Sequence, residues 1–397
     1  MTEFCMSQES KKEYVAKMRQ RYERRLGRQA RGRLIDEVCA VCGYERKYAI
    51  KVLSGRRNGP FGERRGGPRV RYEVEAEGEV LKRIWLTAEQ PCGKRLKAMV
   101  GLWLPHYEKR YGAMESECRE RLLAMSAATM DRLLASHRAR AGGRGRCGTR
   151  PGTLLRTQIP VRTDHWDVSG PGFLEADTVA HGGESSSGDF VYSVTLTDIH
   201  TQWTETRAIW NRGQAAVLER VREVEAALPF EILGFDSDNG GEFLNWHLYH
   251  YFSLRPKVVR FTRSRAYRKN DNAHVEQRNW THVRQLVGYE RLDEPAQAEL
   301  LNDLYAHEWG WFRNFFCATM KHLKTEVEGS RKRRLYDVPL TPFARLKASG
   351  TLPASRLQEL ETLHGRLDPF ALKESIERKL RKVLRYRGRP TRGQAAA

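Results

Sequence analysis

The chain has 397 residues, 40% of them hydrophobic and 10% aromatic, so we expect two to four folded domains rather than general disorder. Lys and Arg number 70 against 49 Asp and Glu, which gives a net charge of +21 and indicates a polyanionic partner. No apolar run approaches the roughly 18 residues of a membrane-spanning helix, so nucleic acid is favoured over a membrane as that partner.

The N-terminus lacks both the basic start and the apolar block of a signal peptide, and the seven scattered cysteines fit a reducing compartment. We therefore expect a soluble cytoplasmic protein. Cys39 and Cys42 form half of a zinc-site pattern, but no second pair follows and the first histidine is His106. We expect no structural zinc.

Residues 1–55 predict a helix-turn-helix DNA-binding module. A helix over 11–25 and apolar positions at helical spacing over 34–41 precede a turn at Gly43, and a further helix runs over 45–53. Arg46, Lys47 and Lys51 lie on the surface of this last helix, where a recognition helix contacts DNA. A plain three-helix bundle is the alternative, because it has similar spacing.

Two arginine-rich linkers and a second helical module follow. Residues 56–71 form a basic linker, residues 72–140 a second helical module similar to a helix-turn-helix, and residues 141–168 an Arg/Gly-rich linker. Basic side chains in these segments are candidates to contact phosphates, with a solvated tether as the alternative for the linkers. The candidates are Arg56, Arg57, Arg64, Arg65, Arg138, Arg144 and Arg146.

Residues 169–328 predict an α/β domain. Strands are expected at 173–178, 190–198, 202–210, 231–236 and 257–262, and helices at 214–227, 243–252 and from about 273. Three successive strands followed by alternating helices and strands indicate a mixed sheet flanked by helices. A helical continuation over 297–328 carries an aromatic cluster around Trp309 and Phe316, for which core or subunit interface is favoured over base stacking.

Three carboxylates of this domain are candidate metal ligands. Asp177 lies late in the first strand, Asp238 follows the fourth strand in a glycine turn, and Glu276 begins the last helix. Strand ends and a helix start converge at one rim of such a sheet. Oxygen-only ligands favour Mg²⁺ or Mn²⁺, and two such ions can serve phosphoryl transfer. Asp236 is an alternative to Asp238, and Glu175 is a candidate to support the site from the same face as Asp177.

A basic segment lies just before Glu276. We expect it to hold phosphates near the metal ions, with a solvated loop as the alternative. Its candidates are Arg260, Arg263, Arg265, Arg268 and Lys269.

Three motifs resemble the DDE integrase core, which retroviral integrases share with many bacterial insertion-sequence transposases. They are Glu-Ala-Asp-Thr at 175–178, Asp-Ser-Asp-Asn-Gly-Gly-Glu-Phe at 236–243 and Asn-Asp-Asn-Ala-His-Val-Glu-Gln at 270–277. Asp177, Asp238 and Glu276 match the metal-binding triad, and the last interval of 38 residues (276 − 238) is close to the family's interval of about 35. The resemblance covers about 171–312 and implies an RNase H-like fold. The missing His/Cys zinc module fits the bacterial branch better than the retroviral one.

Residues 329–397 read as a basic C-terminal region. An irregular basic link is expected over 331–342, and a basic amphipathic helix follows from an Asp368 cap, with DNA binding or multimer contact both open.

The resemblance implies a DNA transposase that cleaves element ends and transfers the 3′-hydroxyl into target DNA, using two Mg²⁺ or Mn²⁺ ions and no nucleotide cofactor. Its expected partners are the terminal inverted repeats, the target DNA and further copies of the chain, at the bacterial nucleoid. The alternatives are a non-catalytic DNA-binding regulator and an RNase H-like nuclease without strand transfer.

Overall fold

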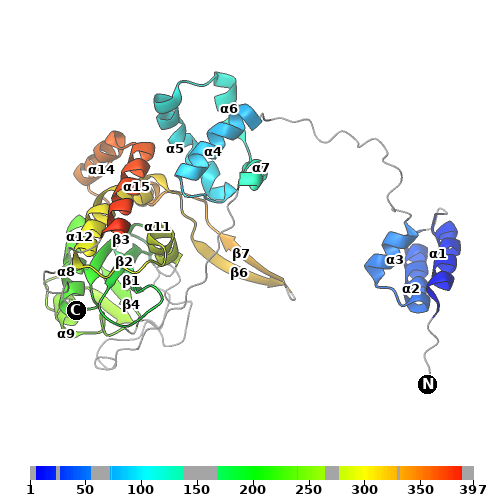
Figure 1. Cartoon of the computed structure of the whole chain (residues 1–397), viewed down its shortest axis with the longest axis horizontal. Coiled ribbons are helices and arrows are strands. Elements are labelled where there is room, and N and C mark those ends of the chain that lie inside the picture. The colour runs from blue at the N-terminus through cyan, green and yellow to red at the C-terminus, as the bar shows by residue number, and fades with distance from the viewer. Residues whose placement is uncertain are drawn as a thin grey trace, which may run out of the picture. The chain divides into compact units, whose positions relative to one another are not determined.

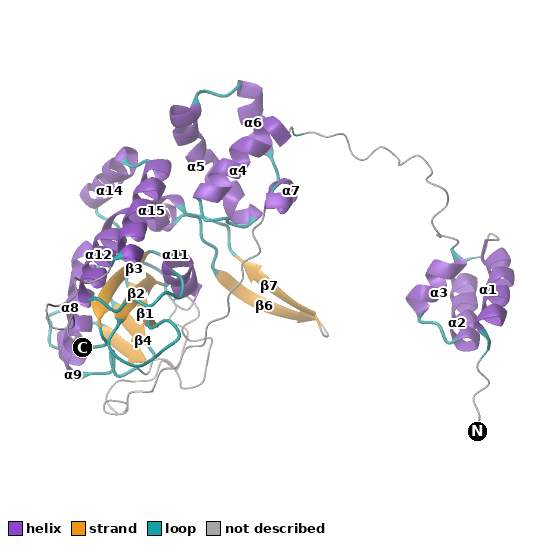
Figure 2. Cartoon of the chain, viewed as in Figure 1, coloured by secondary structure: helices purple, strands orange, loops and turns teal. Residues whose placement is uncertain are grey.

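Five strands form one mixed sheet in the order β3-β2-β1-β4-β5 in the computed structural model of the chain (Figures 1 and 2). The pairs β1–β2 and β2–β3 are antiparallel, whereas β1–β4 and β4–β5 are parallel. This strand order, with helices on both faces, confirms the predicted RNase H-like fold. The strands are β1 (Phe173–Ala180), β2 (Val191–Asp198), β3 (Thr204–Trp210), β4 (Gly234–Ser237) and β5 (Arg260–Arg263).

The structure describes residues 6–23, 27–54, 72, 74–137, 168–238, 240–263, 277–328 and 331–386. They fall into two compact units, Met1–Arg71 and Tyr72–Ala397. None of the helices in these described ranges is long and apolar enough to cross a membrane.

The first unit contains three helices, α1 (Gln8–Glu23), α2 (Arg28–Cys42) and α3 (Arg46–Leu53). Gly43 ends α2 with a φ of 66°, a left-handed conformation that glycine adopts without strain. The buried core includes Val38, Cys42 and Ala49. Because these positions face inward, the basic residues of α3 point to solvent.

The two faces of the sheet differ in chemistry. One face presents Leu174, Leu196 and Phe235 to helices α8 (Gln214–Ala227) and α9 (Trp246–Ser253), and the Phe235 ring lies 4.8 Å from that of Phe252. Successive side chains of a strand point to opposite faces, so the residues next to these apolar ones belong to the other face of the sheet. That face is polar and still buried, with Glu175, Thr195, Thr197 and Asp236 among its members. It carries the predicted carboxylates.

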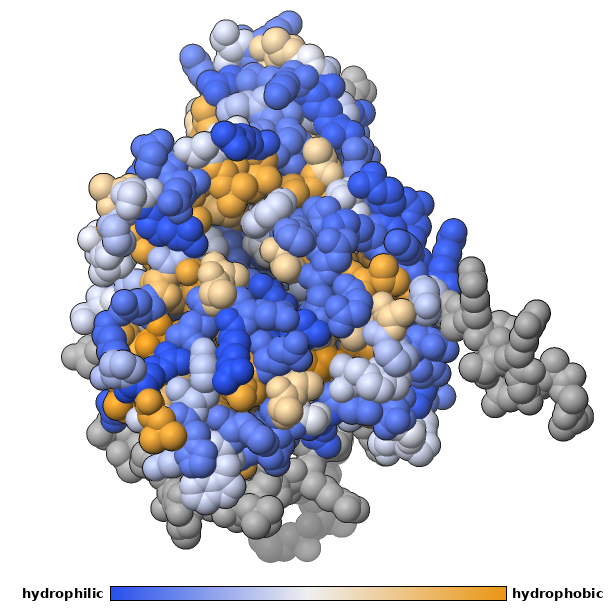
Figure 3. Space-filling model, turned by 90° about the vertical axis from the view of Figure 1, so that its left-hand side faces the viewer, coloured by the Kyte–Doolittle hydropathy of each residue, from blue (hydrophilic) through white to orange (hydrophobic). Residues whose placement is uncertain are grey.

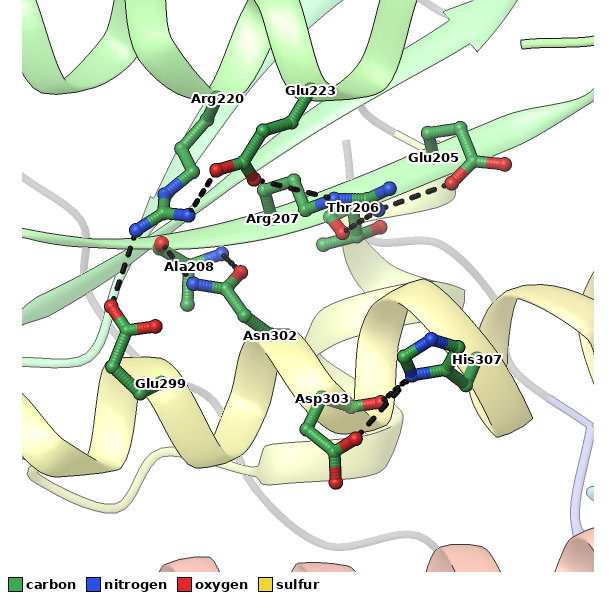
Figure 4. A network of polar contacts seen from close by, with 10 residues as sticks. All are labelled: Glu205, Thr206, Arg207, Ala208, Arg220, Glu223, Glu299, Asn302, Asp303 and His307. Atoms are coloured by element: carbon green, nitrogen blue, oxygen red, sulfur yellow. Dashed lines mark hydrogen bonds and ion pairs between the residues drawn. The ribbon is translucent and has the colours of Figure 1, made fainter. Parts of the chain in front are cut away.

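The β3 edge of the sheet is buried and covered by two asparagine side chains. Asn302 in α12 (Pro295–Leu304) accepts a hydrogen bond from the Ala208 amide at 2.7 Å and donates one to the Ala208 carbonyl at 2.9 Å (Figure 4). Asn314 makes the same pair of bonds with Thr204, each at 3.0 Å. These bonds satisfy backbone groups of β3 that an edge strand otherwise leaves open to another chain.

The second helical module packs on helices that follow the sheet. Trp103 of α5 lies with its ring 5.9 Å from Phe312 and 5.3 Å from Phe370, and its indole NH donates to the Phe316 carbonyl at 3.0 Å. Trp309, Phe312, Phe315 and Phe316 are buried, which confirms that the aromatic cluster is core. The module contains η1 (Val74–Gly78), α4 (Glu79–Thr87), α5 (Gly93–Tyr111), α6 (Ser116–Ala124), α7 (Ala127–Leu133) and η2 (Ala135–His137).

The predictions of helix up to residue 328 and of an irregular link after it are wrong. The antiparallel strands β6 (His322–Glu328) and β7 (Arg331–Tyr336) form a hairpin instead. Thr325 and Val327 favour strand geometry, and Glu326 lies opposite Arg333, which stabilises a cross-strand pair. The exposed Arg333 and Arg334 therefore belong to a regular strand.

Helices make up the rest of the C-terminal half. Asp368 caps α15 by accepting hydrogen bonds from the amides of Phe370 and Ala371, as predicted. Elsewhere the molecular surface seen in Figure 3 is largely hydrophilic, with apolar side chains showing in separate patches. The helices are η3 (Asn279–Arg284), α11 (Gln285–Val287), η4 (Tyr305–Trp309), η5 (Phe312–Phe316), α13 (Pro342–Ser349), α14 (Ala354–Arg366) and α15 (Pro369–Arg385).

Candidate active site

Asp177 and Asp238 occupy equivalent positions on neighbouring parallel strands. The register of β1 and β4 pairs Glu175 with Asp236 and ends with Ala176 opposite Ser237. Asp177 and Asp238 are the next residue on each chain, and adjacent strands lie about 4.8 Å apart. Side chains at matched positions of parallel strands point to the same face, so both carboxylates lie on the polar face at its rim.

Asp177 is held by two hydrogen bonds. Its Oδ1 accepts from the Thr178 amide at 2.7 Å, and its Oδ2 accepts from the side-chain amide of Asn279 at 2.6 Å. Asn279 lies three residues after Glu276 and begins η3. The bond therefore fixes the start of this helix beside Asp177.

Asp238 lies in a half-buried turn and accepts a hydrogen bond from the Gly240 amide at 2.9 Å. Burial raises the pKa of its carboxyl to about 6, and the charge of Glu242 adds to this effect. The Gly240 amide and the charge of Arg212 act in the opposite direction. Negative charge is thus concentrated at this rim.

Glu242 is a carboxylate of the site that the sequence analysis missed. It is only 6% exposed, and its Oε1 accepts from the Thr178 hydroxyl at 3.0 Å and lies 3.5 Å from Arg212. A Cβ added at Gly240 would lie 2.6 Å from the Glu242 carboxylate and 2.9 Å from Asp238 Oδ1. Glycine at 240 therefore lets the chain turn back so that both carboxylates reach one place. We call Asp177, Asp238 and Glu242 the acidic rim.

Two further carboxylates lie deeper on the same face. Glu175 and Asp236 are fully buried, and the Thr262 hydroxyl donates to Asp236 at 2.5 Å. Asp238 is therefore the better placed of the two alternatives for a ligand that arrives from solvent. Glu175 remains a predicted supporting residue.

Glu276 lies outside the described residues, as does the segment 264–276 that leads to it. Described residues on either side of that segment lie near the rim: Arg263 pairs with Ser237, and Asn279, three residues after Glu276, donates to Asp177. Within the described ranges no group of three His, Cys, Asp or Glu side chains forms a metal site. The acidic rim supplies carboxylate oxygens, which are the type of ligand that Mg²⁺ and Mn²⁺ prefer, and a cation there would offset their mutual repulsion.

The predicted DNA contacts are only partly described. Arg46, Lys47 and Lys51 are exposed on α3, and Arg46 pairs with Asp36. Arg260 is exposed and Arg263 is half-buried. The other predicted contacts lie outside the described residues: Arg56, Arg57, Arg64, Arg65, Arg138, Arg144, Arg146, Arg265, Arg268 and Lys269.

A second group of charges near the polar face was not predicted. Burial lowers the pKa of Arg278 to about 9, and the charges of Arg313, Arg95 and Arg345 add to this effect. The other three arginines therefore lie near Arg278, and we call the four the arginine cluster. Arg278 follows Glu276 by two residues, but the other three come from distant helices. No local sequence pattern could have revealed them together.

Comparison with known proteins gives one close relative. No family model matches the chain. An uncharacterized protein of Sinorhizobium fredii, y4rM, is 40% identical over 318 residues, which cover 79% of this chain and 88% of the relative.

Three of the similar solved structures contain retroviral integrases, and their similarity to this chain is distant. The integrase catalytic core of HTLV-2, in complex with magnesium, has a TM-score of 0.28 and 12% identity, and covers 38% of this chain and 91% of that one. The BIV integrase core has a TM-score of 0.30 and 13% identity, with 45% and 96% covered. The simian T-cell lymphotropic virus intasome has a TM-score of 0.30 and 12% identity, with 54% and 70% covered. The fold assignment rests on strand order and register rather than on these scores.

Proposed function

The chain belongs to the same family as the uncharacterized protein y4rM of Sinorhizobium fredii, and we propose that it is a DNA transposase with a DDE active site. The observation that carries the proposal is that Asp177 and Asp238 each follow the last paired residues of β1 and β4 in an RNase H-like sheet, with Asn279 holding the segment after Glu276 against Asp177. The motif resemblance supplies the reaction type.

Asp177, Asp238 and Glu276 would hold two Mg²⁺ or Mn²⁺ ions. Bound there, the ions would supply activation of the attacking oxygen and stabilisation of the leaving oxygen. The protein's own residues set the geometry: Asn279 and the Thr178 amide orient the two oxygens of Asp177, and the Gly240 amide orients Asp238. Because Asp177 and Asp238 are each held by such donors, little reorganisation of these two carboxylates is needed when DNA binds.

The proposed reaction exchanges phosphodiester bonds in two steps. Water attacks the phosphorus at the element end and the 3′-oxygen of the cleaved strand leaves with a proton. That 3′-hydroxyl then attacks a target phosphodiester, whose own 3′-oxygen leaves. No bond energy is lost to hydrolysis in the second step, so no nucleotide cofactor is required.

DNA contacts outside the active site would come from helix α3 and from the two linkers. Helix α3 would bind the terminal inverted repeats through Arg46, Lys47 and Lys51, which its packing leaves in solvent. The two arginine-rich linkers would follow the phosphate backbone. Two ends must be paired, so the active species would be a multimer of this chain.

The test is Asp238→Ala in the full-length protein, with Asp189→Ala on an exposed loop as the matched control. We expect Asp238→Ala to bind DNA containing the element ends and to lose Mg²⁺-dependent cleavage, while the control keeps both. Normal cleavage by Asp238→Ala would overturn the site assignment.

The same assay separates the alternatives. Joined products on a plasmid target identify a transposase, whereas cleavage without joining identifies a nuclease. Sequence-specific binding by the wild type without any cleavage identifies a regulator.

A further inference from the structure

A cavity of about 250 Å³ lies between the turn that joins α4 to α5 and the helical residues from Gln277 onward. Its volume is somewhat below that of pockets that hold whole small molecules, roughly 300 Å³ and above. A group such as a phosphate with part of a sugar fits this size better than a complete cofactor. Residues of its wall include Gln90, Cys92, Arg95, Trp280, Thr281 and Arg313.

The wall carries positive charge that the protein does not balance. The Nε atoms of Arg95 and Arg313 are buried and make no hydrogen bond. The Nε of Arg278 is also buried without a partner, although its Nη2 donates to Gln202 at 2.7 Å. Of the four residues in the arginine cluster, Arg345 alone forms an ion pair with a carboxylate of the described residues, that of Asp337.

Buried guanidinium groups without counter-charges are costly, and neighbouring ones repel each other. Glu89 also lines the cavity, but its carboxylate is engaged by Lys373. An anion between Arg95 and Arg313 would supply both the missing charge and the missing acceptors. Guanidinium groups are well suited to phosphate oxygens, which they bind through paired N–H donors.

The rim of the cavity is held in an unusual backbone conformation. Glu89 and Gln90 have φ values of 64° and 51°, in the left-handed region that residues other than glycine rarely adopt. Such strain gathers at binding sites, where surrounding structure enforces a shape that a ligand needs.

Trp280 adds an aromatic surface to the same wall. Its side chain is 46% exposed although it belongs to a helix whose neighbours Asn279 and Thr281 are buried. Aromatic rings beside cationic groups are the combination with which proteins hold a nucleic-acid strand, by stacking and by phosphate contact.

We propose that this cavity binds a phosphodiester group of the DNA strand, with Arg95 and Arg313 as donors to its oxygens and Trp280 against the adjoining nucleotide. The inference rests on the proposed function in that it takes the ligand to be DNA. The proposed site adds a DNA contact from the second helical module. Helix α5 and the helical residues after Glu276 would then contact the same DNA strand.

The experiment uses full-length Arg95→Gln and measures binding of a labelled duplex by fluorescence anisotropy at several salt concentrations. Loss of one phosphate contact should lower affinity about tenfold and reduce the slope of log affinity against log salt by about one. Lys94→Gln is the matched control, since Lys94 is exposed, adjacent in sequence and outside the cavity wall. It should change affinity less than about twofold. Equal affinities for the two variants would overturn the inference.

Thermal unfolding with inorganic phosphate identifies the source of the anion. Phosphate should raise the Tm of the wild type and leave that of Arg95→Gln unchanged. A phosphate-dependent rise in the Tm of the wild type, together with normal DNA binding by Arg95→Gln, would show that the cavity binds a free anion. That result would overturn the proposal that its ligand is DNA.

A second variant covers the case in which Arg95→Gln does not fold. Trp280→Ala removes an exposed side chain and should weaken binding of gapped DNA several-fold; unchanged binding would count against the inference. Absence of DNA binding by the wild type would overturn the proposed function as well, whereas normal binding by both cavity variants would overturn this inference alone.

Discussion

The acidic rim and the arginine cluster are both groups of like charge, but the protein holds them differently. Each carboxylate of the acidic rim receives at least one hydrogen bond from a backbone amide or a side chain. All four arginines keep a buried Nε without a hydrogen-bond partner, and three of them form no ion pair with a carboxylate of the described residues. The acidic rim is thus organised before any ligand binds, whereas the arginine cluster needs a ligand to complete it. A catalytic group must be positioned in advance, while a binding group can be satisfied by what it binds.

The largest expected effect comes from Asp177→Asn, which removes a charge from the acidic rim and keeps the side-chain shape. Mg²⁺-dependent cleavage should fall by about 10³- to 10⁴-fold, since metal stabilisation is worth several kcal/mol, and DNA binding should persist. Single-turnover cleavage at saturating DNA measures this. Arg95→Gln should show the reverse pattern, with weaker binding and a normal rate. If both variants lost the same property, either DNA binding or cleavage rate, the acidic rim and the arginine cluster would not differ in role.

Arg345→Gln tests the arginine of the cluster that forms an ion pair with a carboxylate of the described residues. Arg345 donates to Asp337 at 2.6 Å and to the Thr319 carbonyl at 3.0 Å, and it is buried. Its loss removes the cation paired with Asp337, whose carboxylate keeps, among the described residues, only the hydrogen bond from the Lys321 amide, and should cost about 3 to 5 kcal/mol of unfolding free energy. Arg95→Gln should cost less than about 1 kcal/mol, because it has no such partner. Urea unfolding of both variants measures these free energies. Equal losses of unfolding free energy would contradict the expected difference between Arg345 and Arg95.

Gly240→Ala should separate the carboxylates of the acidic rim without changing charge. The new Cβ would collide with Glu242 and Asp238, and a displacement of about 1 Å can cost about 10²-fold in rate. The control is Gly365→Ala, where an added Cβ meets no atom within 4 Å. The Gly240→Ala variant should therefore cleave about 10²-fold more slowly than the Gly365→Ala control. Equal cleavage rates would show that the added Cβ does not displace the carboxylates.

The smallest effect is expected from Asn279→Ala, which removes the donor that orients Asp177. Loss of a group that orients a metal ligand costs about tenfold or somewhat more. The maximal cleavage rate should fall by this factor. A titration with Mg²⁺ should show that the variant needs a higher Mg²⁺ concentration for half-maximal cleavage. A lowered Tm with an unchanged Mg²⁺ requirement would instead make Asn279 a purely structural residue.

The sheet and the placement of Asp177 and Asp238 were predictable because their signals are local. Strands rich in β-branched residues and a glycine turn after Asp238 fix where each carboxylate falls. Glu242 was missed although its signal was local too: it follows two glycines and returns toward Asp238. The hairpin was missed because the basic run at 331–334 reads as solvated chain, while the alternation over 322–328 already favoured a strand.

The arginine cluster could not be predicted from one sequence. Arg95, Arg278, Arg313 and Arg345 are separated by helices and linkers, and only packing of the second helical module on the helices after the sheet brings them together. The same limit applies to Asn302 and Asn314, which read as ordinary helical polar residues.

The asparagine bonds to β3 also have a consequence for synthesis. They join residues 94 and 110 positions apart in the chain, so the strand is made long before the side chains that cover its edge. During translation the nascent sheet has an open edge until both asparagines have left the ribosome. Such an edge can pair with another unfinished chain, and long-range closure of this kind is slow. The production of active protein should therefore depend on how quickly the ribosome passes from β3 to the end of η5.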